Sequence, residues 1–97
     1  MEAANFSVDM RTIKLSGREA SVVRAIGFTN SMLGAEIQDY VRMESDDVTD
    51  ILNSLMSAGF VESIPYSEQI ELAEMSVMAF EVNPAYSHEL KRALTRT

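Results

Sequence analysis

The feature that most constrains folding is a stripe of apolar residues at helical spacing in the middle of the chain. The stripe follows an i, i+3, i+4, i+7 pattern and consists of Val48, Ile51, Leu52 and Leu55. This spacing puts the four side chains on one face of a helix. Ser45-Asp46-Asp47 supplies a hydroxyl cap and two carboxylates for the positive end of that helix, and Gly59 is suited to close it. We therefore expect an amphipathic helix that begins near Ser45 and ends before Gly59.

Two further helices are predicted upstream of this one. Ser16-Gly17-Arg18-Glu19 forms a capping box, in which the Ser16 hydroxyl and the Glu19 carboxylate each satisfy a free backbone N–H. The apolar residues that follow, with Gly27 after them, predict a helix over residues 17–26. After a short extended step at residues 28–29, Asn30 or Ser31 can cap a second helix. Its apolar side would carry Leu33, Ile37, Tyr40 and Val41.

The region after Gly59 alternates as strands do. Residues 60–64 alternate and stop at Pro65, and residues 77–82 alternate again with Met78, Phe80 and Val82 on one face. We expect these two strands to pair as a hairpin. The connecting residues 67–76 fit both a strand alternation and a helical turn, and we interpret them as a long hairpin tip.

The two ends of the chain have different patterns. Asn83-Pro84 ends the second strand, and Ser87 opens a last helix that extends to about Arg96. Residues 1–15 form a predicted N-terminal arm in which Phe6, Val8 and Met10 alternate like a strand. The arm either joins a sheet, crosses to another subunit or is disordered. Residues 16–97 form the predicted domain.

Composition narrows the class of protein. A hydrophobic fraction of 46% with 24% charged residues is that of a globular domain, and 97 residues allow one. The chain has no apolar run long enough to span a membrane and no signal-like start, which predicts a cytoplasmic protein without membrane contact. Zero cysteines exclude disulfides, thiolate nucleophiles and cysteine-based metal sites.

No pattern of residues indicates catalysis. His88 is the only histidine, and no nucleophile or metal motif lies near it. Glu68, Glu71 and Glu74 can attract a hard cation, but the chain lacks the aspartate-rich loop of an EF-hand and any phosphate-binding glycine loop. We expect a protein that is not an enzyme, with no cofactor and no metal site.

The order of predicted elements resembles the winged helix-turn-helix superfamily, in particular its small MarR-like regulators. Val48, Leu52, Leu55 and Gly59, followed by Phe60-Val61-Glu62, resemble a recognition helix that leads into the first wing strand. Residues 80–85, followed by a helix, are similar to the second wing strand and C-terminal helix. The resemblance covers residues 16–96 and implies an α+β fold, with a three-helix core, a β-hairpin wing and a C-terminal helix. This fold supports DNA readers, dimerisation modules and protein-docking modules alike.

The charge pattern decides between these functions. No lysine or arginine occurs from Met43 to Leu90, whereas DNA affinity rests largely on such residues. The outward residues of the central helix and the wing are expected to form a partner-binding surface consisting of Asp46, Asp47, Thr49, Asp50, Asn53, Glu68, Glu71 and Glu74. Its carboxylates oppose nucleic acid and favour a basic protein partner. We therefore expect a regulatory module that acts mainly through protein contacts or homodimerisation.

Two other interpretations remain open. In the first, the chain is a DNA-binding transcriptional regulator, and phosphates are contacted by Arg42, Lys91, Arg92 and Arg96. In the second, the acidic residues are only a solvated face and the basic residues serve solubility and helix ends. In either case we expect a homodimer, in which the basic residues can pair with the acidic middle of a second copy.

Overall fold

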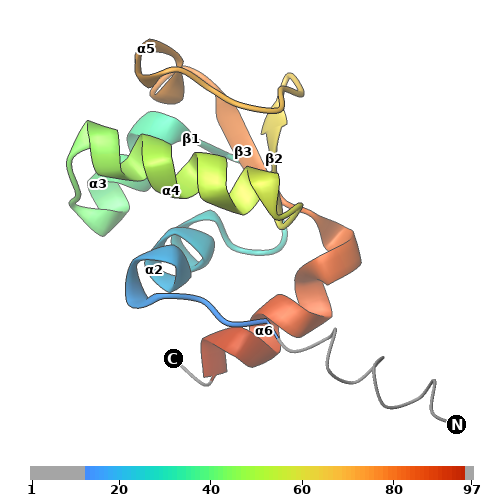
Figure 1. Ribbon diagram of the computed structural model, residues 1–97. Helices are drawn as coiled ribbons and strands as arrows, with labels where there is room; N and C mark the ends of the chain where they lie inside the picture. The colour runs from blue at the N-terminus through green and yellow to red at the C-terminus, as the bar shows by residue number, and fades with distance from the viewer. Residues whose placement is uncertain (1–12, 96–97) are drawn as a thin grey trace, which may run out of the picture.

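A computed structural model shows a small α+β domain with a three-stranded antiparallel sheet. The structure describes residues 13–95, and residues 1–12 and 96–97 lie outside it. The elements in chain order are α2 (Gly17–Ile26), β1 (Met32–Leu33), α3 (Gly34–Val41), α4 (Ser45–Ser57), β2 (Val61–Ile64), α5 (Leu72–Met75), β3 (Ala79–Val82), the 3-10 turn η1 (Pro84–Tyr86) and α6 (Ser87–Thr95). Figure 1 shows α4 crossing in front of the sheet, α2 below it, and α6 at the opposite end from α5.

The first helix matches its prediction at both ends. Ser16 Oγ accepts a hydrogen bond from the Glu19 N–H at 3.1 Å, and Glu19 Oε1 accepts one from the Ser16 N–H at 2.9 Å. This reciprocal pair is the predicted capping box. Val22, Val23 and Ile26 are buried on one side of α2, which fixes the face that packs against α3 and α4.

The second helix begins later than the sequence indicated. Residues 28–30 form a bend, and Leu33 belongs to β1 rather than to the apolar face of the helix. α3 starts at Gly34 because the chain passes against the backbone of Met75 there, so closely that a Cβ on Gly34 would overlap the Met75 carbonyl oxygen. The prediction of a cap at Asn30 or Ser31 is wrong. Glu36 instead accepts a hydrogen bond from the Leu33 N–H.

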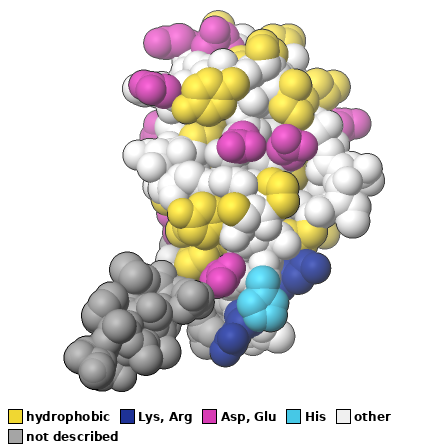
Figure 2. Space-filling model, turned by 90° about the vertical axis from the view of Figure 1, so that its right-hand side faces the viewer, with side chains coloured by type: hydrophobic (Ala, Val, Ile, Leu, Met, Phe, Trp, Pro, Cys, Tyr) yellow, Lys and Arg dark blue, Asp and Glu magenta, His cyan; other side chains and the backbone are white. Residues whose placement is uncertain are grey.

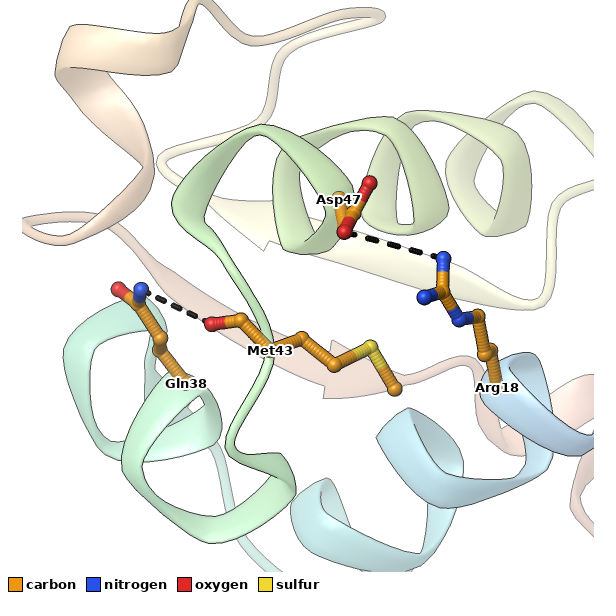
Figure 3. Close-up of polar contacts among 4 residues, drawn as sticks. All are labelled: Arg18, Gln38, Met43 and Asp47. Carbon is orange, nitrogen blue, oxygen red and sulfur yellow. Dashed lines mark hydrogen bonds and ion pairs between the residues drawn. The ribbon is translucent and has the colours of Figure 1, made fainter.

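The turn between α3 and α4 is held by one glutamine. Gln38 Nε2 donates to the Met43 carbonyl at 3.1 Å and to the Ser45 hydroxyl oxygen at 3.0 Å. α4 begins at Ser45 as predicted, but the Ser45 hydroxyl is used by Gln38 and Glu44 occupies the N-cap position without a side-chain bond. Figure 3 shows Gln38 reaching across from α3 to the Met43 carbonyl.

The predicted hairpin is present, and the sheet has one buried face. Its strand order is β1-β3-β2, with β3 antiparallel to both neighbours. Val61, Ser63, Phe80 and Val82 are buried toward the helices. Because side chains alternate along a strand, Glu62, Ile64, Ala79 and Glu81 point to the outer face of the sheet.

The connection between β2 and β3, residues 65–78, is not the long hairpin tip that we expected. The segment turns back onto α4 and forms the single helical turn α5, with Ile70 and Met75 buried in the core. A helical turn is present, but not with the apolar face that Ile70, Ala73 and Val77 indicated, because Ala73 and Val77 are exposed. The strand alternation of Ile70, Leu72 and Glu74 is absent, and Leu72 is exposed. Two anchored apolar residues, rather than a regular repeat, determine its path.

The last helix closes the domain. Asn83 accepts a hydrogen bond from the Ala85 N–H and donates one to the Gly59 carbonyl at 2.9 Å, which joins the end of β3 to the end of α4. Leu90 and Ala93 of α6 are buried, and Ile13, just before α2, also contributes to the core.

The predicted strand at residues 6–10 lies outside the described residues. No helix within residues 13–95 is long and apolar enough to cross a membrane.

Candidate functional site

The exposed side of α4 carries two aspartates that share one face. Asp46 and Asp50 are exposed and four residues apart, so they are neighbours on the helix surface. They border a hollow of about 340 Å³ between α4 and the β2–β3 connection. The other residues lining this hollow are Thr49, Asn53, Gln69, Ile70, Glu71 and Leu72. The structure therefore brings part of the helix and part of the β2–β3 connection to one surface.

Thr49 does not face outward as we expected. Its side chain is buried, and its hydroxyl donates to the Ser45 carbonyl at 2.8 Å, one turn earlier in α4. The hydroxyl of a threonine in a helix commonly bonds back to the preceding turn. Thr49 therefore contributes to the floor of the hollow, where its hydroxyl is already paired within α4.

The expectation that the Asn53 amide faces outward is also wrong, because both ends of the amide are used inside the domain. Asn53 Nδ2 donates to the Ile70 carbonyl at 3.0 Å, and the Ile70 N–H donates to Asn53 Oδ1 at 2.8 Å. Ile70 is buried at the point where the β2–β3 connection meets α4. The asparagine therefore fastens that connection to the helix and forms one wall of the hollow.

Asp47 does not border the hollow beside α4 and is directed toward α2 instead. Its Oδ2 is 3.8 Å from Arg18 Nη1 of α2, and Figure 3 shows the two side chains pointing toward one another. Both side chains keep substantial solvent exposure, 64% for Arg18 and 39% for Asp47, so the pair contributes little to stability. It does balance the charge of Asp47 within the domain.

The three glutamates of the β2–β3 connection are exposed but not equivalent. Glu74 Oε1 accepts a hydrogen bond from the Glu71 N–H at 2.8 Å and so caps α5. Glu71 lines the hollow beside α4. Glu68 lines a second hollow, of about 450 Å³, next to β2 and the end of α4. The two hollows share Gln69, and no lysine or arginine is among the described residues that line them.

The basic residues considered for phosphate contact lie on other elements. Arg42 is exposed at the end of α3, where its φ of 58° is left-handed. Lys91 and Arg92 are exposed on α6, and Lys91 Nζ lies 5.3 Å from the centre of the Phe28 ring. Arg96 lies outside the described residues. Figure 2 shows Lys and Arg side chains beside the histidine at the lower end of the molecule, with an acidic group next to them and further acidic side chains at the middle and upper end.

The outer face of the sheet carries an apolar row that was not predicted from the sequence. Leu33 of β1 and Ile64 of β2 both lie opposite Ala79 of β3, and they are 44% and 42% exposed. Next to this apolar row, Glu62 and Glu81 lie directly opposite one another. The alternation of residues 60–64 and 77–82 contained the signal, but the register that aligns the two glutamates requires the pairing of the strands.

The described residues suggest no metal centre. No group of three or more His, Asp or Glu side chains within residues 13–95 is arranged to hold a metal ion. His88 is exposed in the first turn of α6. The arrangement consists of exposed carboxylates next to an exposed leucine, Leu72, which is 52% accessible.

Comparisons of the chain with protein-family models, with characterised proteins and with solved structures give no match.

Proposed function

We propose that the chain is a winged helix-turn-helix domain that acts as a regulatory protein-contact module. The order of helix, strand, helix, helix, hairpin and helix supports this assignment, as does the β1-β3-β2 sheet. In this assignment α4 is the recognition helix and the β2–β3 connection is the wing. The partner surface lies where these two meet.

The observation that carries the proposal is the charge of that surface. Asp46, Asp50 and Glu71 surround the hollow beside α4, and no cation lies among the described residues that line it. A phosphate backbone placed there would meet repulsion of roughly 1 kcal/mol per unit charge at about 4 Å in water. Nucleic acid binding instead requires Lys and Arg at the contact surface.

The surface suits a basic protein segment for two reasons. Its carboxylates can accept charge-assisted hydrogen bonds from Lys or Arg, and the chain's net charge of -7 attracts a basic partner at long range. Leu72 adds an exposed apolar side chain at the rim, against which the aliphatic part of a lysine or arginine can pack. The proposed partner is therefore a protein that presents several Lys or Arg residues among apolar ones.

The Asp50→Asn variant tests the proposal with a labelled Lys- and Leu-rich peptide as the probe. Asp50 is exposed in the middle of α4, so the change removes one charge from the surface and leaves the fold intact. Loss of one charge contact of about 1 kcal/mol weakens peptide binding about fivefold. Asp39→Asn on α3 is the matched control, because it makes the same change at an exposed position outside the hollow.

Two results would overturn the proposal. The first is an equal loss of peptide affinity in Asp50→Asn and Asp39→Asn, because the acidic surface would then act only through net charge. The second is sub-micromolar binding of random duplex DNA at about 50 mM salt that falls steeply as salt rises, which is the behaviour of phosphate contacts. That second result would support the DNA-binding alternative, with Arg42, Lys91 and Arg92 as the residues to test next.

A further inference from the structure

Repulsion between two glutamates on the sheet points to a second contact surface. Glu62 of β2 and Glu81 of β3 are cross-strand partners in the antiparallel register, and both side chains lie on the outer face. Like charges directly opposite one another destabilise a sheet. The arrangement therefore weakens the isolated domain and becomes favourable when cations from outside neutralise the pair.

Exposed basic residues lie on α6, which the turn η1 joins to β3. They belong to an exposed stripe at helical spacing formed by His88, Lys91, Arg92 and Thr95. In Figure 2 the histidine, the single cyan side chain, marks α6 beside dark-blue Lys and Arg groups. An acidic group also lies near the histidine in this view. Glu89 of α6 is half-buried and already takes part in an interaction within the chain.

Apolar side chains separate the two charged clusters. Tyr86, in the turn η1 that joins β3 to α6, is 37% exposed and packs edge-on against Phe60, with ring centres 5.2 Å apart. Phe60 immediately precedes β2, and its carbonyl accepts the Asn83 N–H at 2.8 Å, so it continues the strand pairing by one residue. From β3 through η1 into α6, the chain thus passes Glu81 of the acidic pair, then Tyr86, then the basic stripe. Because side chains alternate along a strand, Phe60 lies on the same outer face as Glu62, and Tyr86 packs against it there.

This order is complementary to itself. Rotation by 180° about an axis through the aromatic pair exchanges the acidic end with the basic end, which is the requirement for an isologous interface between two identical chains. The same rotation places the two aromatic pairs together at the centre, where interfaces gain most from large apolar side chains.

We propose that the acidic pair, the aromatic pair and the basic stripe form one surface, and that this surface binds a second copy of the chain about a two-fold axis near Tyr86. In the dimer, Lys91 and Arg92 of each copy meet Glu62 and Glu81 of the other copy. The inference goes beyond the proposed function, which concerns the hollow beside α4, and gives a specific surface to the homodimer that the sequence led us to expect. Because its surface does not include the hollow beside α4, it can fail without the peptide-binding proposal failing, and the reverse also holds.

The overall charge provides a sharp test. Two chains of net charge -7 repel one another, so any substitution that lowers the negative charge should favour association if net charge alone decides it. Glu62→Lys/Glu81→Lys lowers the net negative charge, yet it adds two lysines to the proposed interface, which then carries four basic residues per chain together with Lys91 and Arg92. It also keeps a like-charged pair across the two strands, so the fold should be about as stable as before.

Analytical ultracentrifugation at about 0.15 M salt, where the Debye length is about 8 Å, measures the effect. The unmodified chain should sediment as a dimer at about 100 µM, and Glu62→Lys/Glu81→Lys should weaken dimerisation at least tenfold, which corresponds to about 1.4 kcal/mol. Lys91→Glu/Arg92→Glu should weaken it as well. Asp39→Lys/Glu44→Lys makes the same change in net charge at exposed positions away from the interface, and it should leave the dimer intact.

Mixing the two interface variants provides the decisive result. Each variant alone presents charges of one sign, but a mixed pair restores opposite charges at both ends of the interface, so a heterodimer should form with an affinity close to that of the unmodified dimer. The inference is overturned if the unmodified chain is a monomer at this concentration. It is also overturned if Glu62→Lys/Glu81→Lys dimerises as tightly as the unmodified chain, or if the mixture stays monomeric while circular dichroism shows both variants folded.

Discussion

Replacing Asn53 by alanine should weaken the attachment of the β2–β3 connection to α4 without removing any buried apolar side chain. In the native domain the Asn53 amide donates to the Ile70 carbonyl at 3.0 Å and accepts from the Ile70 N–H at 2.8 Å. Alanine leaves both backbone groups of Ile70 without these partners. Ile70 is only 2% exposed, so its apolar contacts oppose the detachment.

The size of the effect follows from these two bonds. A buried backbone group left without a partner costs about 1–3 kcal/mol. Because both residues line a hollow that water can enter, the lower end applies, or about 2 kcal/mol for the two groups together. Alanine is a better helix residue than asparagine by about 0.5 kcal/mol, which offsets part of the loss. The expected net decrease in unfolding free energy is about 1.5 kcal/mol, roughly a tenfold change in the folding equilibrium.

Urea denaturation followed by far-UV circular dichroism measures this decrease, and the slope against urea should not change. Amide hydrogen exchange gives the local readout, because exchange at Ile70 should accelerate more than exchange in α2. Asn30→Ala is the matched control at an exposed asparagine outside the helices, and it should change the unfolding free energy by less than about 0.5 kcal/mol. The reasoning is refuted if Asn53→Ala is as stable as Asn30→Ala and exchange at Ile70 is unchanged.

Two further substitutions test the packing. Gly34→Ala should destabilise the domain by about 3 kcal/mol or more, because its Cβ would overlap the Met75 carbonyl oxygen. Gly17→Ala is the control and should be tolerated, because the space around its Cβ is open. Equal melting temperatures for the two variants would contradict the close approach of Gly34 to Met75. Leu52→Ala removes a fully buried side chain of α4 and should lower the unfolding free energy measured by urea denaturation by about 2–5 kcal/mol. Ile51→Ala, at a half-buried position of the same stripe, should lower it less. The reverse order would mean that α4 packs by a different face.

Local signals predicted most of the helices and the hairpin. The capping box at Ser16 and the stripe from Val48 to Leu55 placed α2 and α4 closely, because caps and periodicity act within a few residues. The alternation in residues 60–64 and 77–82 likewise identified β2 and β3 and their buried face. Each of these signals is a property of a short segment and needs no distant contact to appear.

The elements that were predicted wrongly depend on contacts between distant segments. Leu33 is a strand residue because it pairs with Ala79, although its position also fitted the apolar face of a helix. The β2–β3 connection turns back onto α4 because Ile70 and Met75 are buried there, which no short-range repeat indicated. Tertiary contacts override weak local preferences when they bury apolar side chains.

For the candidate surface too, some properties were evident from the sequence and others only from the structure. Its acidic character was evident from the sequence, since the absence of Lys and Arg from Met43 to Leu90 is a matter of composition. Which carboxylates share a face was not evident: Asp46 and Asp50 border the hollow, whereas Asp47 turns to Arg18 and Asn53 is bound to Ile70.

The sequence by itself therefore determined the charge of the central region and the elements with strong local signals, because both are carried by residues close together in the chain. Only the tertiary structure decided which polar groups remain available to a partner. Availability depends on whether another segment already occupies a side chain, as Ile70 occupies Asn53. It also depends on strand register, which alone aligns Glu62 with Glu81 and creates the repulsion that a second copy can relieve.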